Sequence, residues 1–206
     1  MSGLPPTIAI ASRNAHKLRE IRRIAADWPV AWVSVEDKPD APWPNVEETG
    51  ITYAENALLK ARAVASALGL PALADDSGIE VDALGGGPGP RSARYAGESA
   101  TDEQNLRQLI RALAGVPGSG RTARYRCVAA LAHPDGTELH AEAICEGTLT
   151  SAPRGSEGFG YDPIFVPAGW DRTMAELTAA EKDRISHRGR AIRALRATLE
   201  EAAPPA

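Results

Sequence analysis

Short apolar runs alternate with amphipathic segments along this chain, a pattern typical of a protein that contains both strands and helices. Residues 7–12, Thr-Ile-Ala-Ile-Ala-Ser, form an apolar run without glycine and predict a buried opening strand. The spacing then becomes helical, with Asn14 as the expected N-cap and apolar residues every three or four positions. A second strand is predicted at 30–35, and a loop with several prolines follows over 38–50.

The clearest helix signal begins at Thr52. Thr52 and Glu55 have the spacing of a capping box, an apolar stripe follows, and Gly69 marks the expected end. Another capped helix is predicted from Thr101 to about Ala114. Further on, two apolar segments at 124–132 and 138–148 flank Asp135-Gly136, which predicts a long antiparallel hairpin with a two-residue turn, and a last helix is expected at about 189–200.

Two adjacent acids interrupt the chain's third apolar run. Pro71–Ala74 predicts a short buried strand that stops at Asp75 and Asp76, and Ser77-Gly78 predicts a turn before another strand at 79–84. Neighbouring side chains of a strand point to opposite faces, so we expect only one of the two acids to face a site. A carboxylate at a strand end suits a hard cation or a general base, although an Asp pair that merely closes a strand is the structural alternative.

Composition places the chain among ordinary globular proteins. It has 206 residues, of which 43% are apolar and 24% charged, and no apolar run approaches the roughly 18 residues of a membrane span. The net charge of -4 argues against a sequence-independent nucleic-acid binder. The N-terminus lacks the pattern of a signal peptide, and Cys127 and Cys145 are too few for a disulfide framework. We therefore expect a cytoplasmic protein with no membrane or nucleic-acid partner.

One polar stretch suits a phosphorylated ligand. The loop Ser12–Lys17 offers a hydroxyl, an amide, a cation and the backbone N–H groups of a helix N-terminus, although many ordinary helices start in this way. The glycine loop at 85–92 lacks the Gly-Lys-Ser/Thr of a P-loop. Asn56 and Lys60 lie four apart on one helical face; a solvated polar pair is the default interpretation, and a functional role needs support from elsewhere.

The segment Gly158–Phe165 combines glycines with aromatic residues. Glycine on either side of Phe159 would let a ring and backbone approach a flat base, and Asp162 could accept a hydrogen bond from its edge. A tight turn with Phe159 in the core is the alternative interpretation. The basic run from Lys182 to Arg190 would ordinarily be a solvated face.

Seven blocks, taken together and in order, resemble the inosine/xanthosine triphosphate pyrophosphatase family. The resemblance extends from about residue 7 to residue 200. The blocks that carry it are Ala11–Lys17, Glu47–Gly50, Tyr53–Ala57, Leu73–Gly78, Arg91–Tyr95, Gly158–Pro163 and Ser186–Gly189.

The resemblance implies an enzyme that hydrolyses the purine nucleoside triphosphates ITP, dITP and XTP to the monophosphate and pyrophosphate with Mg2+, removing them from the nucleotide pool. It also implies a mixed α/β fold: an elongated central mixed β-sheet with flanking helices forms two lobes, and the active site lies in the cleft between them. Residues 1–206 would form a single domain of this kind, and a homodimer is expected.

The resemblance also implies roles for individual residues. Asp76 would be the proton acceptor, and Glu47 together with Asp76 would hold the metal. The substrate would be bound by Ser12, Arg13, Asn14, Ala15, His16, Lys17, Ser77, Phe159, Gly160, Tyr161, Asp162, Lys182, His187 and Arg188. One departure from the family is Arg13, where glycine is usual; its side chain could narrow the phosphate loop or add a cation to it.

Two other functions fit parts of the same pattern. A pyrophosphatase of the same architecture could act on modified pyrimidine nucleotides or on all standard nucleotides. A nucleotide-binding module without catalysis belongs to another class, and the substitution at Arg13 is the feature that favours it. Asp76, Glu47 and Lys17 together favour an enzyme, because binding alone does not need a carboxylate at a metal position.

Overall fold

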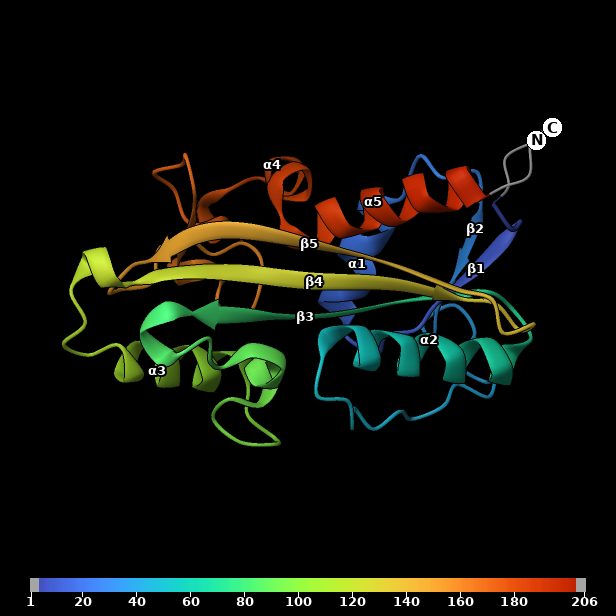
Figure 1. Ribbon diagram of the computed structural model, residues 1–206, viewed down its shortest axis with the longest axis horizontal. Coiled ribbons are helices and arrows are strands. Elements are labelled where there is room, and N and C mark those ends of the chain that lie inside the picture. The colour runs from blue at the N-terminus through green and yellow to red at the C-terminus, as the bar shows by residue number, and fades with distance from the viewer. Residues whose placement is uncertain (1–3, 203–206) are drawn as a thin grey trace. The chain divides into compact units, whose positions relative to one another are not determined.

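The computed structural model describes residues 4–202, and strands and helices follow one another along the chain (Figure 1). The strands are β1 (Thr7–Ile10), β2 (Ala31–Val33), β3 (Ala72–Val81), β4 (Thr122–Ala132), β5 (Glu138–Leu149) and β6 (Phe165–Pro167). The helices are α1 (Ala15–Ile24), α2 (Tyr53–Leu68), α3 (Asp102–Ala112), α4 (Ala179–Ile185) and α5 (His187–Ala202).

The strands form one six-stranded sheet in the order β2-β1-β3-β4-β5-β6. β1 runs parallel to β2 and β3, whereas β5 runs antiparallel to β6. The sheet is therefore mixed, and helices flank it, so the predicted fold class is confirmed.

The chain divides into two compact units. Unit 1 comprises the residues up to Asp76, Cys127–Ala143 and those from Arg188 onward, and unit 2 comprises Ser77–Arg126 and Ile144–His187. Strands β3, β4 and β5 contribute residues to both units. The predictions of a single domain and of a cleft site stay predictions.

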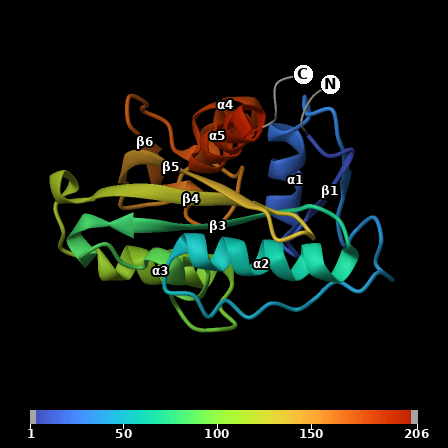
Figure 2. The ribbon, with the colours of Figure 1, turned by 45° about the vertical axis from the view of Figure 1, so that its right-hand side comes forward.

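Unit 1 packs helices on both faces of its part of the sheet. α1 and α5 lie on one face and α2 on the other (Figures 1 and 2). Ile8, Ile10 and Leu18 belong to the buried cluster under α1 and α5. The cluster under α2 is built from small residues, with Ala61 and Ala65 packed against strand alanines. Small side chains on both surfaces let this helix pack closely against β1 and β3.

Unit 2 has its own core around Ile79, Leu109 and Phe165. α3 lies on one face of the strands in this unit and α4 on the other (Figure 2). α3 begins at the predicted cap, and a capping box forms there: Thr101 accepts from the Gln104 amide and the Gln104 side chain accepts from the Thr101 amide.

The predicted helix ends are confirmed in unit 1 too. The Asn14 carboxamide accepts from the backbone N–H groups of the first turn of α1. Thr52 and Glu55 form the capping box of α2, and Gly69 ends that helix in the left-handed conformation, with φ of 62°. These signals are local in sequence, which is why they could be recognised without the fold.

The predicted turn at Ser77-Gly78 is wrong. β3 runs without interruption from Ala72 to Val81, so the two acids lie within a ten-residue strand. In unit 2 the amide of Ile79 donates to the hydroxyl of Ser92 at 2.8 Å, so a side chain satisfies this strand amide. A Ser-Gly pair is a turn signal only where nothing else pairs the backbone.

The hairpin between β4 and β5 is confirmed, but its turn is one residue longer than predicted. The His133 amide donates to the Thr137 carbonyl at 2.8 Å, which leaves three residues in the turn. Gly136 has a φ of 91°, as expected for the residue that adds a bulge to such a turn.

Among residues 4–202, no helix is both long and apolar enough to cross a membrane. Met1, Ser2 and Gly3, on which the prediction about a signal peptide partly depends, lie outside the described residues.

Candidate active site

The two adjacent acids of β3 have different partners, as expected for neighbours in a strand. Asp75 contacts the face of unit 1 that carries α1 and α5. Its Oδ2 lies 3.1 Å from Lys17 Nζ and 3.0 Å from Arg188 Nη2. Arg188 also forms an ion pair with Glu20 of α1. A buried cluster of two acids and two bases thus joins β3 to both helices.

This cluster keeps Asp75 ionised. Burial alone would raise the pKa of Asp75, but Arg188 and then Lys17 outweigh it and hold the pKa well below its ordinary value. Arg188 is only 1% exposed, so a partner is needed for its charge. The Cys127 thiol lies 4.0 Å from Asp75, and burial raises the pKa of this thiol. Cys127 is therefore an inert thiol beside the cluster.

Asp76 contacts α2 on the other face. Asn56 Nδ2 donates to Asp76 Oδ2 at 3.3 Å, and Lys60 Nζ lies 3.2 Å from Asp76 Oδ1. Lys60 also lies 2.7 Å from a carboxylate oxygen of Glu48. The interpretation of Asn56 and Lys60 as a solvated pair is therefore wrong, because both side chains are turned toward a buried acid.

The surroundings of Asp76 favour proton acceptance. Burial raises its pKa, the negative charges of Glu48 and Asp75 raise it further, and Lys60 and Lys17 lower it, with a net shift upward. The pKa of Lys60 is also raised, because the pull of Asp76 and Glu48 exceeds the effect of its burial. A carboxylate with a raised pKa beside a fixed cation is a common arrangement for a general base.

The predicted phosphate loop has the geometry of a capped helix start. Asn14 Oδ1 accepts from the amides of His16 at 2.9 Å and Lys17 at 3.2 Å, and the Ser12 hydroxyl accepts from the Asn14 amide. Ala15 and His16 are exposed, while Lys17 is turned inward toward Asp75. The loop therefore combines exposed polar groups with one ammonium whose position is fixed.

Arg13 extends toward the 38–50 loop. Its Nη2 donates to the carbonyl oxygen of Trp43 at 3.0 Å, and the Trp43 indole donates to the carbonyl of Lys38. Glu47, farther along that loop, is exposed, whereas Glu48 is turned toward Lys60. The Arg13 side chain thus links the predicted phosphate loop to the loop that carries Glu47.

A second group of predicted residues lies in unit 2, around Asp162. The Asp162 carboxylate accepts from the Phe159 amide at 2.9 Å and forms a buried ion pair with Lys182. Lys182 also lies over the Phe159 ring, 5.0 Å from its centre. Gly158 has a φ of 75°, and a Cβ there would come within 2.2 Å of Asp162. The glycine before the aromatic residue is thus needed for the turn to close on this acid.

The other members of the unit 2 group are held individually. The His187 imidazole stacks on the Tyr125 ring. Tyr161 is buried and donates its hydroxyl hydrogen to the Ser92 carbonyl at 2.7 Å. The Gly160 amide donates to Asp102 at 3.1 Å, and Ser77 is half-buried.

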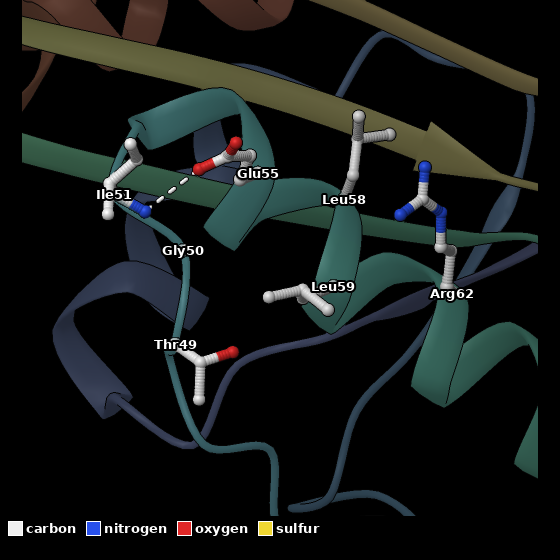
Figure 3. Close-up of a pocket in the computed structure, with 7 residues that line it drawn as sticks. All are labelled: Thr49, Gly50, Ile51, Glu55, Leu58, Leu59 and Arg62. Atoms are coloured by element: carbon white, nitrogen blue, oxygen red, sulfur yellow. Dashed lines mark hydrogen bonds between the residues drawn. The ribbon is translucent and has the colours of Figure 1, made fainter.

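The structure also has a surface pocket that includes none of the predicted site residues. It lies beside the N-terminal half of α2, and its volume is about 380 Å³ (Figure 3). Its lining residues are Thr49, Gly50, Ile51, Glu55, Leu58, Leu59 and Arg62. The α2 residues among them follow an i, i+3, i+4, i+7 spacing and belong to another face of the helix than Asn56 and Lys60. The side chains that line the pocket are therefore not those that contact Asp76, although the amide of Gly50 donates to Asn56 Oδ1 at 2.8 Å.

Six residues with clear roles in these clusters were not among the predicted site residues: Glu20, Glu48, Asn56, Lys60, Asp75 and Tyr125. The spacing of Asn56 and Lys60 was visible, and both interrupt the small-residue stripe that packs α2 on the sheet. A polar pair within a buried stripe was therefore the signal for them. Glu20 and Tyr125 have partners far away in sequence and carried no comparable signal.

The mixed sheet with its flanking helices defines a protein of the α/β class. Comparison with known proteins then identifies the family: the family model described as "Ham1 family" matches residues 8–198, and the chain belongs to this family. It is 52% identical over 196 residues to the dITP/XTP pyrophosphatase of Streptomyces coelicolor, with 94% of this chain and 97% of the relative covered.

Two further proteins show the same similarity. The dITP/XTP pyrophosphatase of Geobacillus kaustophilus is 50% identical over 194 residues, covering 94% of each chain. A solved HAM1 protein from Coxiella burnetii has a TM-score of 0.83 at 42% identity, covering 96% of this chain and all of the other. The resemblance inferred from the sequence blocks is thereby confirmed.

Proposed function

We propose that this enzyme hydrolyses dITP, XTP and ITP to the nucleoside monophosphate and pyrophosphate in a Mg2+-dependent reaction. The observation that carries the proposal is Asp76, a buried carboxylate of raised pKa held between Asn56 and Lys60. The names of the Streptomyces and Geobacillus relatives support the substrate class. A cytoplasmic location and a homodimer stay predictions.

The donor set of unit 1 fits Mg2+. This hard cation binds carboxylate oxygens, retains several waters and needs only one or two protein ligands when phosphate oxygens supply others. Asp76 and Glu47 would hold the ion, and both present the oxygen ligands that it prefers. When bound, Mg2+ would neutralise negative charge on the triphosphate. Among residues 4–202, no three His, Cys, Asp or Glu side chains are grouped so that they could hold a metal ion by themselves.

The chain's own residues would perform the remaining steps. Asp76 would accept a proton from the attacking water, because Asn56 and Lys60 hold its carboxylate in a fixed position. Lys60, fixed between Asp76 and Glu48, would keep the acid oriented. Lys17, fixed by Asp75, would stabilise the charge that develops on the leaving pyrophosphate. The loop Ser12–Lys17 would bind the triphosphate oxygens.

The unit 2 group would recognise the base. Inosine and xanthosine carry a carbonyl at C6, where adenine has an amino group, so donors from Lys182 and His187 would pair with the former only. A buried donor left unpaired costs about 1–3 kcal/mol, so two donors would give a large preference. Phe159 to Asp162 and Ser77 would hold the base and sugar. Arg188 is buried between Glu20 and Asp75, so we assign it a positioning role through Asp75.

The point of attack can be tested with labelled water. Hydrolysis of ITP in water enriched in oxygen-18 should place the label in IMP, because the attacking water adds to the α phosphorus. Mass spectrometry of both products measures this directly. Label in pyrophosphate would contradict attack at the α position, and heat of ITP binding in calorimetry without turnover would favour a binding module.

Replacing Glu47 with glutamine should raise the Mg2+ concentration needed for half-maximal activity by roughly tenfold or more, because a charged ligand is lost. Titration of activity with Mg2+ at saturating ITP measures the shift. The matched control is Glu48→Gln, since Glu48 contacts Lys60 and is not a proposed ligand. If only Glu48→Gln raised the Mg2+ requirement, the two adjacent glutamates would have to exchange roles.

A further inference from the structure

Tyr125, which no sequence motif singled out, contacts two members of the unit 2 group. Its ring is stacked on His187, with 4.5 Å between ring centroids and 9° between the planes. Its hydroxyl donates to Asp162 Oδ1 at 3.3 Å. The Tyr125 ring also packs against the Phe165 ring in a tilted arrangement, with the two ring centroids 4.7 Å apart. Tyr125 is thus held by its strand, by Phe165 and by the two polar residues it touches.

The contact with Asp162 connects Tyr125 to Lys182. The other oxygen of this carboxylate, Oδ2, forms the ion pair with Lys182 and accepts from the Phe159 amide at 2.9 Å. Asp162 and Lys182 are both buried, with 2% and 5% exposure. A carboxylate that accepts at both oxygens has little freedom to rotate, so the tyrosine hydroxyl restricts the position of the ammonium.

We propose that Tyr125 is a positioning residue that sets the preference for purines with a carbonyl at C6 over adenine. The inference rests on the proposed function, in which Lys182 and His187 donate to that carbonyl. Tyr125 orients both donors, the imidazole through the stacked rings and the ammonium through Asp162.

Fixed donors discriminate better than mobile ones. When a buried donor cannot turn away, a base without an acceptor at C6 leaves it unpaired and binds poorly. When the donor can move, the favoured base loses a pre-oriented hydrogen bond and the disfavoured base meets a smaller penalty. Loss of Tyr125 should therefore lower kcat/KM for ITP and raise kcat/KM for ATP, so the ratio of the two should fall.

The test compares kcat/KM for ITP and for ATP in Tyr125→Phe and Tyr125→Leu. The phenylalanine variant removes only the hydroxyl, and its ratio of ITP to ATP should fall about threefold; the leucine variant also removes the stacked ring, and its ratio should fall roughly tenfold. KM for ITP should rise while kcat stays near the wild-type value, because the phosphate groups are untouched. Tyr95→Phe, a half-buried tyrosine of the same unit core, is the matched control and should keep the wild-type ratio.

Other outcomes would overturn the inference. If both substrates lose activity by the same factor in the Tyr125 variants, the residue is structural only. If the leucine variant does not fold, the phenylalanine variant decides: an unchanged ratio of kcat/KM for ITP to that for ATP in Tyr125→Phe overturns the inference. The wild-type enzyme is measured first, and if it shows no preference for ITP over ATP, the proposed function itself fails and this inference fails with it. If Tyr95→Phe changed the ratio of kcat/KM for ITP to that for ATP as much as the Tyr125 variants do, that result would also count against a specific role of Tyr125.

Discussion

Asp76→Asn should abolish pyrophosphate release from ITP at saturating Mg2+, with a loss in kcat of roughly a thousandfold or more, because both proton acceptance and a metal ligand are removed. Asparagine has nearly the same shape as aspartate and can keep the hydrogen bond from Asn56. The loss therefore reports on charge and basicity at this position. Steady-state release of pyrophosphate measures it.

The same variant should not be destabilised. Burial and neighbouring acids raise the pKa of Asp76 in the folded protein, so the ionised side chain is held in unfavourable surroundings. Removing its charge should leave the free energy of unfolding unchanged or slightly higher. Asp135→Asn, in the exposed hairpin turn, is the matched control for activity, since asparagine suits that turn. An Asp76→Asn enzyme with substantial turnover would contradict the assigned role.

Asp75→Asn, one residue earlier, should instead lower the free energy of unfolding. Asp75 is fully buried and neutralises Lys17 and Arg188, so its loss leaves buried positive charge that Glu20 alone cannot balance. We expect a decrease of about 3 kcal/mol in the free energy of unfolding. Urea denaturation at neutral pH, followed by far-UV circular dichroism, measures this change.

The pH dependence of that stability has a definite sign. The pKa of Asp75 is lower in the folded than in the unfolded protein, where it is near its ordinary value of 3.8. Its contribution is therefore fully present above pH 3.8 and is lost as the pH falls below that value. The Asp75→Asn variant should lack this part of the acid destabilisation. Asp82→Asn, which breaks an exposed ion pair with Arg124, is the matched control and should change stability by less than about 1 kcal/mol.

Equal destabilisation of Asp75→Asn and Asp82→Asn would mean that the buried cluster does not hold α1 and α5 against β3. Loss of stability in Asp76→Asn as large as in Asp75→Asn would likewise contradict the electrostatic contrast between the two acids. The pair of adjacent substitutions therefore tests whether the two acids differ in their contribution to stability.

Much of the local structure could be predicted because its causes lie close together in sequence. The cap at Asn14, the capping boxes at Thr52 and Thr101, and the left-handed Gly69 each depend on residues within one helical turn. The alternation of a strand also predicted that the two acids would face apart, and their separate partners confirm it.

What failed depended on partners far along the chain. The turn expected at Ser77-Gly78 does not form, because β3 continues as a strand to Val81. Lys60 was interpreted as solvated because its two acids lie 12 and 16 residues away. Tyr125 is separated from Asp162 by 37 residues, and no spacing within a strand could indicate that contact. Such contacts follow from tertiary packing, which periodicity does not encode.

The most direct test of the account is the rate of pyrophosphate release from ITP, XTP, ATP and GTP by the wild-type enzyme with Mg2+, measured as kcat/KM for each. The account predicts that ITP and XTP exceed ATP by at least about tenfold, since unpaired buried donors penalise adenine, whereas these donors do not discriminate against GTP, which also carries a carbonyl at C6. Equal rates with all four nucleotides would contradict recognition of the base and leave a pyrophosphatase of broad specificity. Release of no pyrophosphate from any of them would contradict catalysis itself.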